Sequence, residues 1–382
     1  MSPRGIRASV ATAAIAFAAA WPGTAVAMPV FAQAYGVKCN VCHTQVPALN
    51  TYGRYVQRTG YASLDPHVLR RALPIWWDQS VNYDVNGAPR WAAGNMAIHA
   101  VGYLGDDVTY HFQQWILQNN QAGDLDTFWA TYNNLFHRDG HLFVGLIEAP
   151  APSPYSQWMD LAGFTTPEIV VGEHPYELDA NRWGTKIDYI KGSLDLEAGY
   201  MYEGGTVVSQ WGASSDFAET DHTFQYKLAY ANPQYPVEAG VYGARGSWPL
   251  TEGGTDQYWA FAPYVERDPS NGVPGILAIY QMAHDANPGF NTSPNGALAP
   301  IGPTPSTAQT LELYQPIFNE GLLSFRKEWT NSLGALNQTA NIDVNYPVAR
   351  FLRVYVEEYF SSYNKPGWAG MIWWTTPFSS VK

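Results

Sequence analysis

Both cysteines of the chain lie in one five-residue motif, Cys39-Asn40-Val41-Cys42-His43. The C-x-x-C-H spacing is typical of covalent haem attachment. Each thiol would form one thioether with a vinyl group of the porphyrin, and the adjacent imidazole would ligate the iron from the same turn. The sequence therefore predicts one covalent haem c, with Cys39 and Cys42 as attachment sites and His43 as the proximal ligand.

Two other roles for the motif fit less well. A disulfide or redox pair between Cys39 and Cys42 would not need the histidine. Zinc in structural sites takes four ligands, and the motif offers only three. Haem attachment is the role that uses all three side chains.

The distal ligand of the iron is a separate question, and it matters because a Met–His pair raises the reduction potential. His67 is the only other histidine before the first predicted strand. His99 is the second candidate, because strand alternation places it on an inner face. Met28 and His111 are further candidates, whereas the same alternation turns Met96 outward. The sequence does not choose among them.

The N-terminus has the pattern of an export signal. Arg4 and Arg7 precede an apolar stretch, residues 8–20, and Ala25-Val26-Ala27 forms a small-x-small cleavage site. This predicts a secretory signal peptide over residues 1–27. Beyond it no apolar run of 18 residues follows, so no transmembrane helix is expected. We divide the rest into a short, mostly helical haem segment, 28–73, and a large domain, 74–382.

Charge separates these two parts. Residues 28–73 contain five basic residues and one acidic residue, a net charge of +4, whereas residues 74–382 contain 14 basic and 32 acidic residues, a net charge of −18. Opposite charges of this size predict that the two parts attract each other. Lys38, Arg54 and Arg58 could neutralise haem propionates or an acidic lumen. The acidic balance argues against nucleic acid as a partner.

The large domain reads as an all-β, outer-membrane antiparallel β-barrel. Aromatic residues make up 15% of the chain and charged residues only 14%. Segments of alternating polarity, such as residues 194–202, recur along the domain, as in outer-membrane barrels. We expect sixteen strands, an even number, near 75–83, 90–104, 108–118, 125–136, 140–148, 182–190, 194–203, 222–231, 237–247, 256–266, 275–284, 310–318, 321–330, 339–346, 351–361 and 369–378.

Connection lengths support the barrel and orient it. Such barrels have short periplasmic turns and longer extracellular loops. The short connections are 105–107, 137–139, 191–193, 231–236, 319–320 and 346–350, and the long ones include 149–181, 204–221 and 285–309. Long and short connections are predicted to alternate. This alternation places the haem segment on the periplasmic side or in the lumen, in the outer membrane of a Gram-negative bacterium. A soluble periplasmic β-protein is the competing fold.

The segment around the motif resembles a known family. Phe31-Ala32, Tyr35-Gly36-Val37, the Cys39–His43 motif, Pro47-Ala48-Leu49-Asn50, Gly53-Arg54 and Gly60-Tyr61 carry the resemblance. The family is that of the iron-oxidising outer-membrane cytochromes, which fuse a monohaem cytochrome c segment to a porin-like barrel.

The resemblance implies electron transfer from an extracellular donor, Fe(II) above all, to a periplasmic cytochrome or copper carrier. The protein would be an enzyme only in the sense of a ferrous oxidase, and the sequence leaves that open. The competing function is a solute porin whose haem segment is a structural or sensory plug.

A second metal site is predicted in the third extracellular connection, residues 149–181. It carries Glu173, His174 and Glu177, whose carboxylates and imidazole suit a hard or borderline divalent cation. We expect a transient Fe(II) site there, with a hydrated acidic loop as the alternative.

Overall fold

The computed structural model describes residues 29–46, 48–69, 75–118, 120–148, 152, 168–177, 181–201, 222–270, 272–292, 296–318, 321–349, 352–362 and 365–377. The predicted signal peptide, 1–27, and Met28 lie outside these residues.

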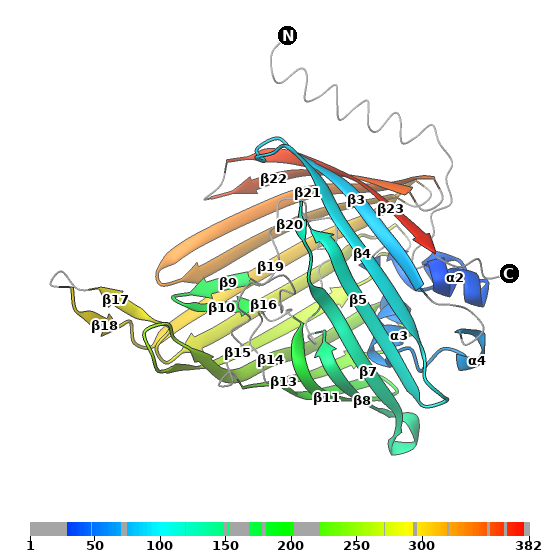
Figure 1. The fold of residues 1–382 in the computed structure, drawn as a ribbon, viewed down its shortest axis with the longest axis horizontal. Coiled ribbons are helices and arrows are strands. Elements are labelled where there is room, and N and C mark those ends of the chain that lie inside the picture. Colours follow the sequence, from blue (N-terminus) through cyan, green and yellow to red (C-terminus); the bar gives the residue numbers. More distant parts are fainter. Residues whose placement is uncertain are drawn as a thin grey trace, which may run out of the picture.

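In the described residues, sixteen long antiparallel strands form one closed barrel, which confirms the predicted fold class (Figure 1). β23 pairs with β3 and closes the ring, from Ala369–Asp84 to Pro377–Trp76. A two-residue strand, β6 (Gln121–Ala122), adds one further pairing to β5. The barrel strands are β3 (Ile75–Asp84), β4 (Trp91–Tyr103), β5 (Val108–Gln118), β7 (Leu125–Leu135), β8 (Gly140–Ile147), β11 (Arg182–Lys191), β12 (Leu194–Met201), β13 (Thr223–Ala231), β14 (Val237–Pro249), β15 (Thr255–Arg267), β16 (Gly275–Asp285), β19 (Thr304–Ile317), β20 (Gly321–Ser332), β21 (Ala335–Ala349), β22 (Leu352–Ser361) and β23 (Gly367–Pro377).

The strands alternate between an apolar outer face and a polar lumen. In β12, Leu194, Leu196 and Tyr200 are exposed, while Asp195 and Glu197 are buried. The same alternation runs along β22 and along most of β21. An outward apolar band of this kind contacts lipid in outer-membrane barrels. The alternation in these strands is what the sequence predicted.

The three long connections leave the barrel at the same end. They span residues 148–181, 202–222 and 286–303, and the lengths of outer-membrane loops make this the extracellular end. The predicted strict alternation of long and short connections is wrong, however. At this end, only two residues, Leu333 and Gly334, join β20 to β21. Both have a positive φ, 50° and 79°, which a tight two-residue hairpin turn requires. At the opposite end, the connection 268–274 is longer than this turn.

The predicted loop 285–309 is too long, and the strand predicted from residue 310 begins at Thr304. Thr304, Ser306 and Thr310 are buried at alternating positions, so the inward face of β19 continues past Pro305. The stretch 285–309 contains Pro288, Pro294, Pro300, Pro303 and Pro305, and a proline has no backbone N–H to donate to a sheet, which is typical of a loop. The connection itself contains a small hairpin, β17 (Phe290–Thr292) and β18 (Leu298–Pro300).

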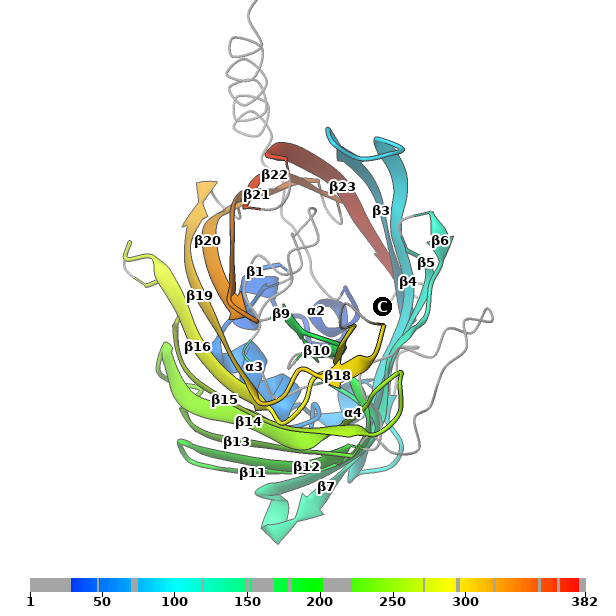
Figure 2. The same cartoon turned by 90° about the vertical axis from the view of Figure 1, so that its left-hand side faces the viewer.

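The N-terminal segment fills the periplasmic end of the lumen, and we call residues 29–69 the plug (Figures 1 and 2). It consists of α2 (Pro29–Tyr35), the 3-10 turn η1 (Cys39–Val41), β1 (His43–Gln45), β2 (Ala48–Leu49), α3 (Thr51–Arg58) and α4 (Pro66–Leu69). Among the described helices, none is long and apolar enough to cross a membrane. A second element lies inside the ring, the hairpin of β9 (Glu168–Val171) and β10 (His174–Glu177).

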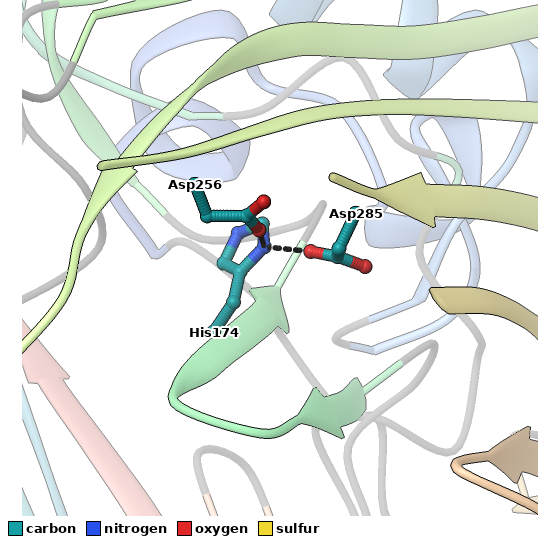
Figure 3. Close-up of side chains that lie close together, drawn as sticks. All are labelled: His174, Asp256 and Asp285. Carbon is teal, nitrogen blue, oxygen red and sulfur yellow. Dashed lines mark hydrogen bonds and ion pairs between the residues drawn. The ribbon is translucent and has the colours of Figure 1, made fainter. Parts of the chain in front are cut away.

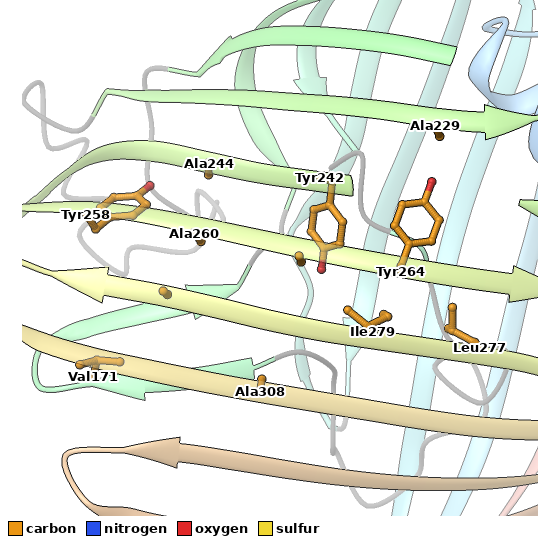
Figure 4. Close-up of a cluster of buried hydrophobic side chains, with 12 residues drawn as sticks. Val171, Ala229, Tyr242, Ala244, Tyr258, Ala260, Tyr264, Leu277, Ile279 and Ala308 are labelled. Carbon is orange, nitrogen blue, oxygen red and sulfur yellow. The ribbon is translucent and has the colours of Figure 1, made fainter. Parts of the chain in front are cut away.

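Two apolar clusters fix these lumenal elements to the wall. Val56 and Tyr61 of the plug pack with Trp76, Val101 and Trp129 of the barrel. Val171 of the hairpin packs against a wall cluster on β13 to β16 and β19 that includes Tyr242, Tyr258 and Tyr264 (Figure 4). The lumen therefore holds one element anchored near each end.

Candidate functional site

Cys39 to Cys42 of the C-x-x-C-H motif form one tight turn of the plug between α2 and β1, and His43 is the first residue of β1. The Cys42 backbone N–H donates to the Cys39 carbonyl oxygen over 3.1 Å. The two cysteines are not joined by a disulfide, and both are partly buried. Burial, with Cys39 nearby, raises the pKa of the Cys42 thiol. His43 follows directly and is 9% exposed. The turn therefore carries the two thiols, and the next residue carries the imidazole.

Asn50 ties this turn to helix α3. Its side-chain oxygen accepts from the Gly53 N–H at 2.9 Å and caps the helix, as asparagine at an N-cap does. Its side-chain amide donates to the carbonyls of Asn40 and Val41, and its backbone N–H donates to the Cys42 carbonyl oxygen at 2.9 Å. The sequence did not assign this role to Asn50, although an asparagine before a helical stretch is a recognisable capping signal.

Gly53 lets helix α3 approach the motif closely. A Cβ atom at this position would overlap the Cys42 carbonyl oxygen and lie 2.9 Å from its carbonyl carbon. Both are backbone atoms, which cannot rotate away as a flexible side chain can. The close packing of α3 on the turn therefore depends on glycine.

Replacing Gly53 with alanine is expected to push the turn away from α3. The cost is about 1–3 kcal/mol, typical of an overpacked core. In cells with a cytochrome c maturation system, the fraction of chains that carry haem should fall, as measured by absorbance per chain. Gly370→Ala is the matched control, because its nearest neighbour atom would be 3.6 Å from the new Cβ. Equal haem content in both variants would contradict this role of Gly53.

Two arginines of α3 anchor the plug to the acidic wall. Arg54 lies 2.7 Å from Glu266 and 3.1 Å from Asp268, and Arg58 lies 2.7 Å from Glu238 and 3.2 Å from Asp195. The Arg54 and Arg58 side chains are only 13% and 11% exposed. The sequence left two roles open for these arginines, to neutralise haem propionates or an acidic lumen. In the structure, both arginines pair with lumenal carboxylates. Lys38, by contrast, is exposed.

Contacts other than ion pairs add to the anchoring. The Thr51 backbone N–H and hydroxyl both donate to Asp268, and Asn345 of β21 donates to the Val46 carbonyl oxygen at 2.8 Å. The Tyr61 ring stacks on Trp129 with ring centres 5.6 Å apart. Contacts from strands far apart in the ring therefore hold one short segment.

One contact of the plug depends on pH. Gln57 of α3 donates to Glu148, which directly follows β8, at 2.8 Å. Burial raises the pKa of Glu148 from 4.5 to about 6. A carboxyl group whose pKa is higher in the folded state contributes stability below pH 4.5 and loses it as the pH rises through about 6.

Replacing Glu148 with glutamine should remove this loss. Relative to the wild type, the free energy of unfolding of the variant should rise by roughly 1–2 kcal/mol between pH 4.5 and pH 8. Urea unfolding in detergent micelles at the two pH values measures the difference. The exposed Glu252 provides a control, since Glu252→Gln should leave the pH profile unchanged. Parallel profiles for the wild type and Glu148→Gln would contradict the assignment.

The distal-ligand candidates lie in different surroundings. His99 points into the lumen as predicted, where it stacks on Trp76 with ring centres 4.7 Å apart and pairs with Asp78 at 2.8 Å. His67 is exposed on α4. His111 lies 3.2 Å from the Tyr61 hydroxyl of the plug. None of these contacts is with the Cys39–His43 turn, and Met28 lies outside the described residues.

The predicted loop site is divided by the structure. His174 turns toward the barrel wall, where it contacts Asp285 and Asp256 (Figure 3). Glu173 instead accepts a hydrogen bond from the Thr251 backbone N–H at 2.6 Å. The side chain of Glu177 lies outside the described part of the chain. Sequence reasoning missed both aspartates because they are more than 80 residues away from His174.

The motif turn fits a covalent haem. Its two thiols and the imidazole are the groups that haem attachment uses; the thiols lie on the turn without a disulfide, and the imidazole follows on β1. Val37 and Val41 flank Cys39 and are 40% and 42% exposed, although valine is usually buried. An apolar macrocycle held at Cys39 and Cys42 would meet this apolar surface. The donor set and its surroundings are thus compatible with the group.

Comparison with known proteins gives the fold. No protein-family model matches the chain, and no curated protein matches its sequence. Among solved structures, OmpT of Vibrio cholerae in its trimer form aligns with 79% of this chain and 98% of its own, at 12% identity and a TM-score of 0.54. The chain is an outer-membrane β-barrel protein.

Two other barrels align over the same share of this protein. The anion-selective porin from Comamonas acidovorans gives 13% identity, 98% of its own chain and a TM-score of 0.53. OprB of Pseudomonas putida gives 9% identity, 93% of its own chain and a TM-score of 0.52. At these identities the likeness concerns the fold. Together with the apolar outer band, it confirms the predicted location in the outer membrane of a Gram-negative bacterium.

Proposed function

We propose that this barrel is an outer-membrane monohaem cytochrome c, which carries electrons from an extracellular donor to periplasmic carriers. The observation that carries the proposal is the position of the C-x-x-C-H turn. It lies on a plug that buried ion pairs hold inside the barrel, at the end with the short turns. A haem held there would be protected from lipid by the barrel wall.

The roles of the residues follow from this placement. Cys39 and Cys42 would bind the haem covalently, His43 would ligate the iron, and the bound haem would supply one-electron redox chemistry. Asn50 and Gly53 hold the turn on α3, while Arg54 and Arg58 hold α3 on the wall. With ferrous iron as the donor, one electron leaves Fe²⁺ to give Fe³⁺ and is finally accepted by a periplasmic cytochrome or copper protein.

Charge favours a cationic donor. Residues 74–382 carry a net charge of −18, and many of the lumenal side chains are acidic. A lumen lined by one sign of charge concentrates counter-ions and speeds their association. Fe²⁺ fits this field, as does any other small cationic reductant.

The test uses the full chain, matured with haem and purified in detergent. Anaerobic mixing with Fe²⁺ should produce the absorption spectrum of the reduced haem, and a periplasmic-type c cytochrome added later should reoxidise it. A protein that carries haem but is not reduced by Fe²⁺ would overturn the choice of donor. A protein that carries no covalent haem would overturn the whole proposal.

A second function is favoured by the structural neighbours, which include the anion-selective porin from Comamonas acidovorans. In this alternative the barrel conducts solutes, and the plug is a structural or sensory element. A sixteen-stranded barrel is wide enough for an aqueous channel. The acidic lumen would then select cations. Single-channel recording separates the two functions, since large, steady currents through the haem-loaded protein would favour the porin.

A further inference from the structure

Three ionisable side chains from distant parts of the sequence meet in the lumen, and we call His174, Asp256 and Asp285 the lumenal triad (Figure 3). His174 begins β10 of the inner hairpin, Asp256 is the second residue of β15, and Asp285 is the last residue of β16. His174 Nδ1 lies 2.7 Å from Asp285 Oδ1 and 3.7 Å from Asp256 Oδ2. The side chain of His174 is 3% exposed, and those of Asp256 and Asp285 are 0% exposed.

One oxygen of the triad has no donor among the described residues. Asp256 Oδ1 accepts from the Asn287 backbone N–H at 2.8 Å, but Oδ2, which faces His174, receives no hydrogen bond from the described part of the chain. A buried carboxylate oxygen without a donor carries a large desolvation cost. Buried polar atoms of this kind usually have a partner, so this oxygen points to a ligand in the triad.

Electrostatics gives the sign of that ligand. Asp256 and Asp285 place two carboxylates in one buried site, where like charges repel strongly. A cation between them would offset both charges. The imidazole is held for such a role, because it stacks on Trp248 and packs against Tyr258 with ring centres 5.3 Å and 4.2 Å apart.

We propose that the lumenal triad binds one divalent transition-metal cation, such as Mn²⁺, Fe²⁺, Co²⁺ or Zn²⁺. Ligand atoms at about 2.1 Å from a metal and at right angles to each other lie about 3 Å apart. The distances of 2.7 Å and 3.7 Å lie on either side of this value, so small side-chain shifts suffice. One imidazole nitrogen with two carboxylate oxygens suits these ions better than Ca²⁺ or Mg²⁺, which prefer all-oxygen sites.

The site would lie toward the extracellular end of the lumen. Asp256 follows the connection 250–254, and Asp285 precedes the long connection 286–303, at the end opposite the plug. The other end of β15 leads to Asp268, which binds the plug, about 40 Å away along the strand at 3.3 Å per residue. The triad thus stands where a cation from outside would arrive, and its binding does not depend on the proposed haem.

Equilibrium dialysis of the full-length protein in detergent against Mn²⁺ tests the proposal, with bound metal counted by elemental analysis. The wild type should bind one Mn²⁺ per chain, and the electron paramagnetic resonance spectrum should show the sharp signal of the free ion disappearing. Asp256→Asn and His174→Gln should each weaken binding by more than the ~10–100-fold that loss of an outer-shell partner costs. Asp256→Asn keeps an oxygen acceptor for the Asn287 N–H.

Two control variants come from the same end of the barrel. Glu252→Gln, on the exposed connection 250–254, and Glu173→Gln, beside the triad in sequence, should leave binding unchanged. Heat-dependent mobility on gels reports whether each barrel is folded, and His174→Gln serves if Asp256→Asn does not fold.

Two results would overturn the proposal. Equal Mn²⁺ binding by the wild type and both triad variants would show that the triad only pins the hairpin to the wall. Loss of binding in Glu173→Gln but not in the triad variants would assign the ion to the acidic loop instead. Because Mn²⁺ binding needs no haem reduction, either failure is distinct from a failure of the proposed electron transfer.

Discussion

Replacing Arg54 and Arg58 together with glutamine is expected to release the plug from the barrel and to raise single-channel conductance. Each arginine makes buried ion pairs with lumenal carboxylates. Breaking such a pair leaves an uncompensated buried charge and costs about 3–5 kcal/mol. Lys227 also pairs with Asp195 and Glu238, which keeps part of this charge balanced when Arg58 is lost.

Planar-bilayer recording and limited proteolysis measure the release. The wild type should show small or rare openings and a protected N-terminal segment, and the double variant should show larger currents and rapid cleavage within residues 29–69. Arg138→Gln is the control, because Arg138 pairs with Asp107 on the exposed surface, where an ion pair contributes about 0–1 kcal/mol. Wild-type conductance in the double variant would show that the contacts other than these ion pairs hold the plug.

Replacing both Cys39 and Cys42 with alanine is expected to abolish covalent haem attachment. Each thiol supplies one thioether, so the double variant has none, and a denaturing gel stained for haem should show no band. Each single variant should keep one thioether and one vinyl group, and the retained vinyl should shift the pyridine haemochrome absorption to longer wavelength. The stained gel and the pyridine haemochrome spectrum are both measured on protein produced with a cytochrome c maturation system.

Val41→Ala is the matched control for the cysteine variants. Val41 lies inside the motif but is 42% exposed and offers no ligand atom, so haem content should equal that of the wild type. A stained band in the double cysteine variant, or no band in the wild type, would remove the haem assignment. The porin function would then be the one left.

Much of the barrel could be predicted from the sequence. Strands such as β12 and β22 carry a strict two-residue alternation, which pleated geometry converts directly into a lipid face and a lumenal face. Prediction was weaker where local signals compete. Prolines hid the start of β19, and the two-residue turn at Leu333 and Gly334 broke the expected order of loop lengths.

The candidate sites divide in the same way. The C-x-x-C-H motif is local, so its three side chains were found from spacing alone. The lumenal triad joins His174 to Asp256 and Asp285 across three elements, and no spacing rule connects them. In the predicted loop site, Glu173 lies in the turn between β9 and β10 and accepts a hydrogen bond from Thr251 instead of joining His174.

The sequence by itself determined a closed, lipid-facing barrel and a single cysteine motif followed by histidine, because both are short-range patterns of residue type. It also determined the charge difference between the N-terminal segment and the rest. Only the tertiary structure decided which carboxylates receive Arg54 and Arg58, that Asn50 and Gly53 hold the motif turn, and that a buried triad lies at the opposite end. The longest of those contacts joins residues 214 positions apart, Arg54 and Asp268, and ring closure with strand register sets which of these residues meet.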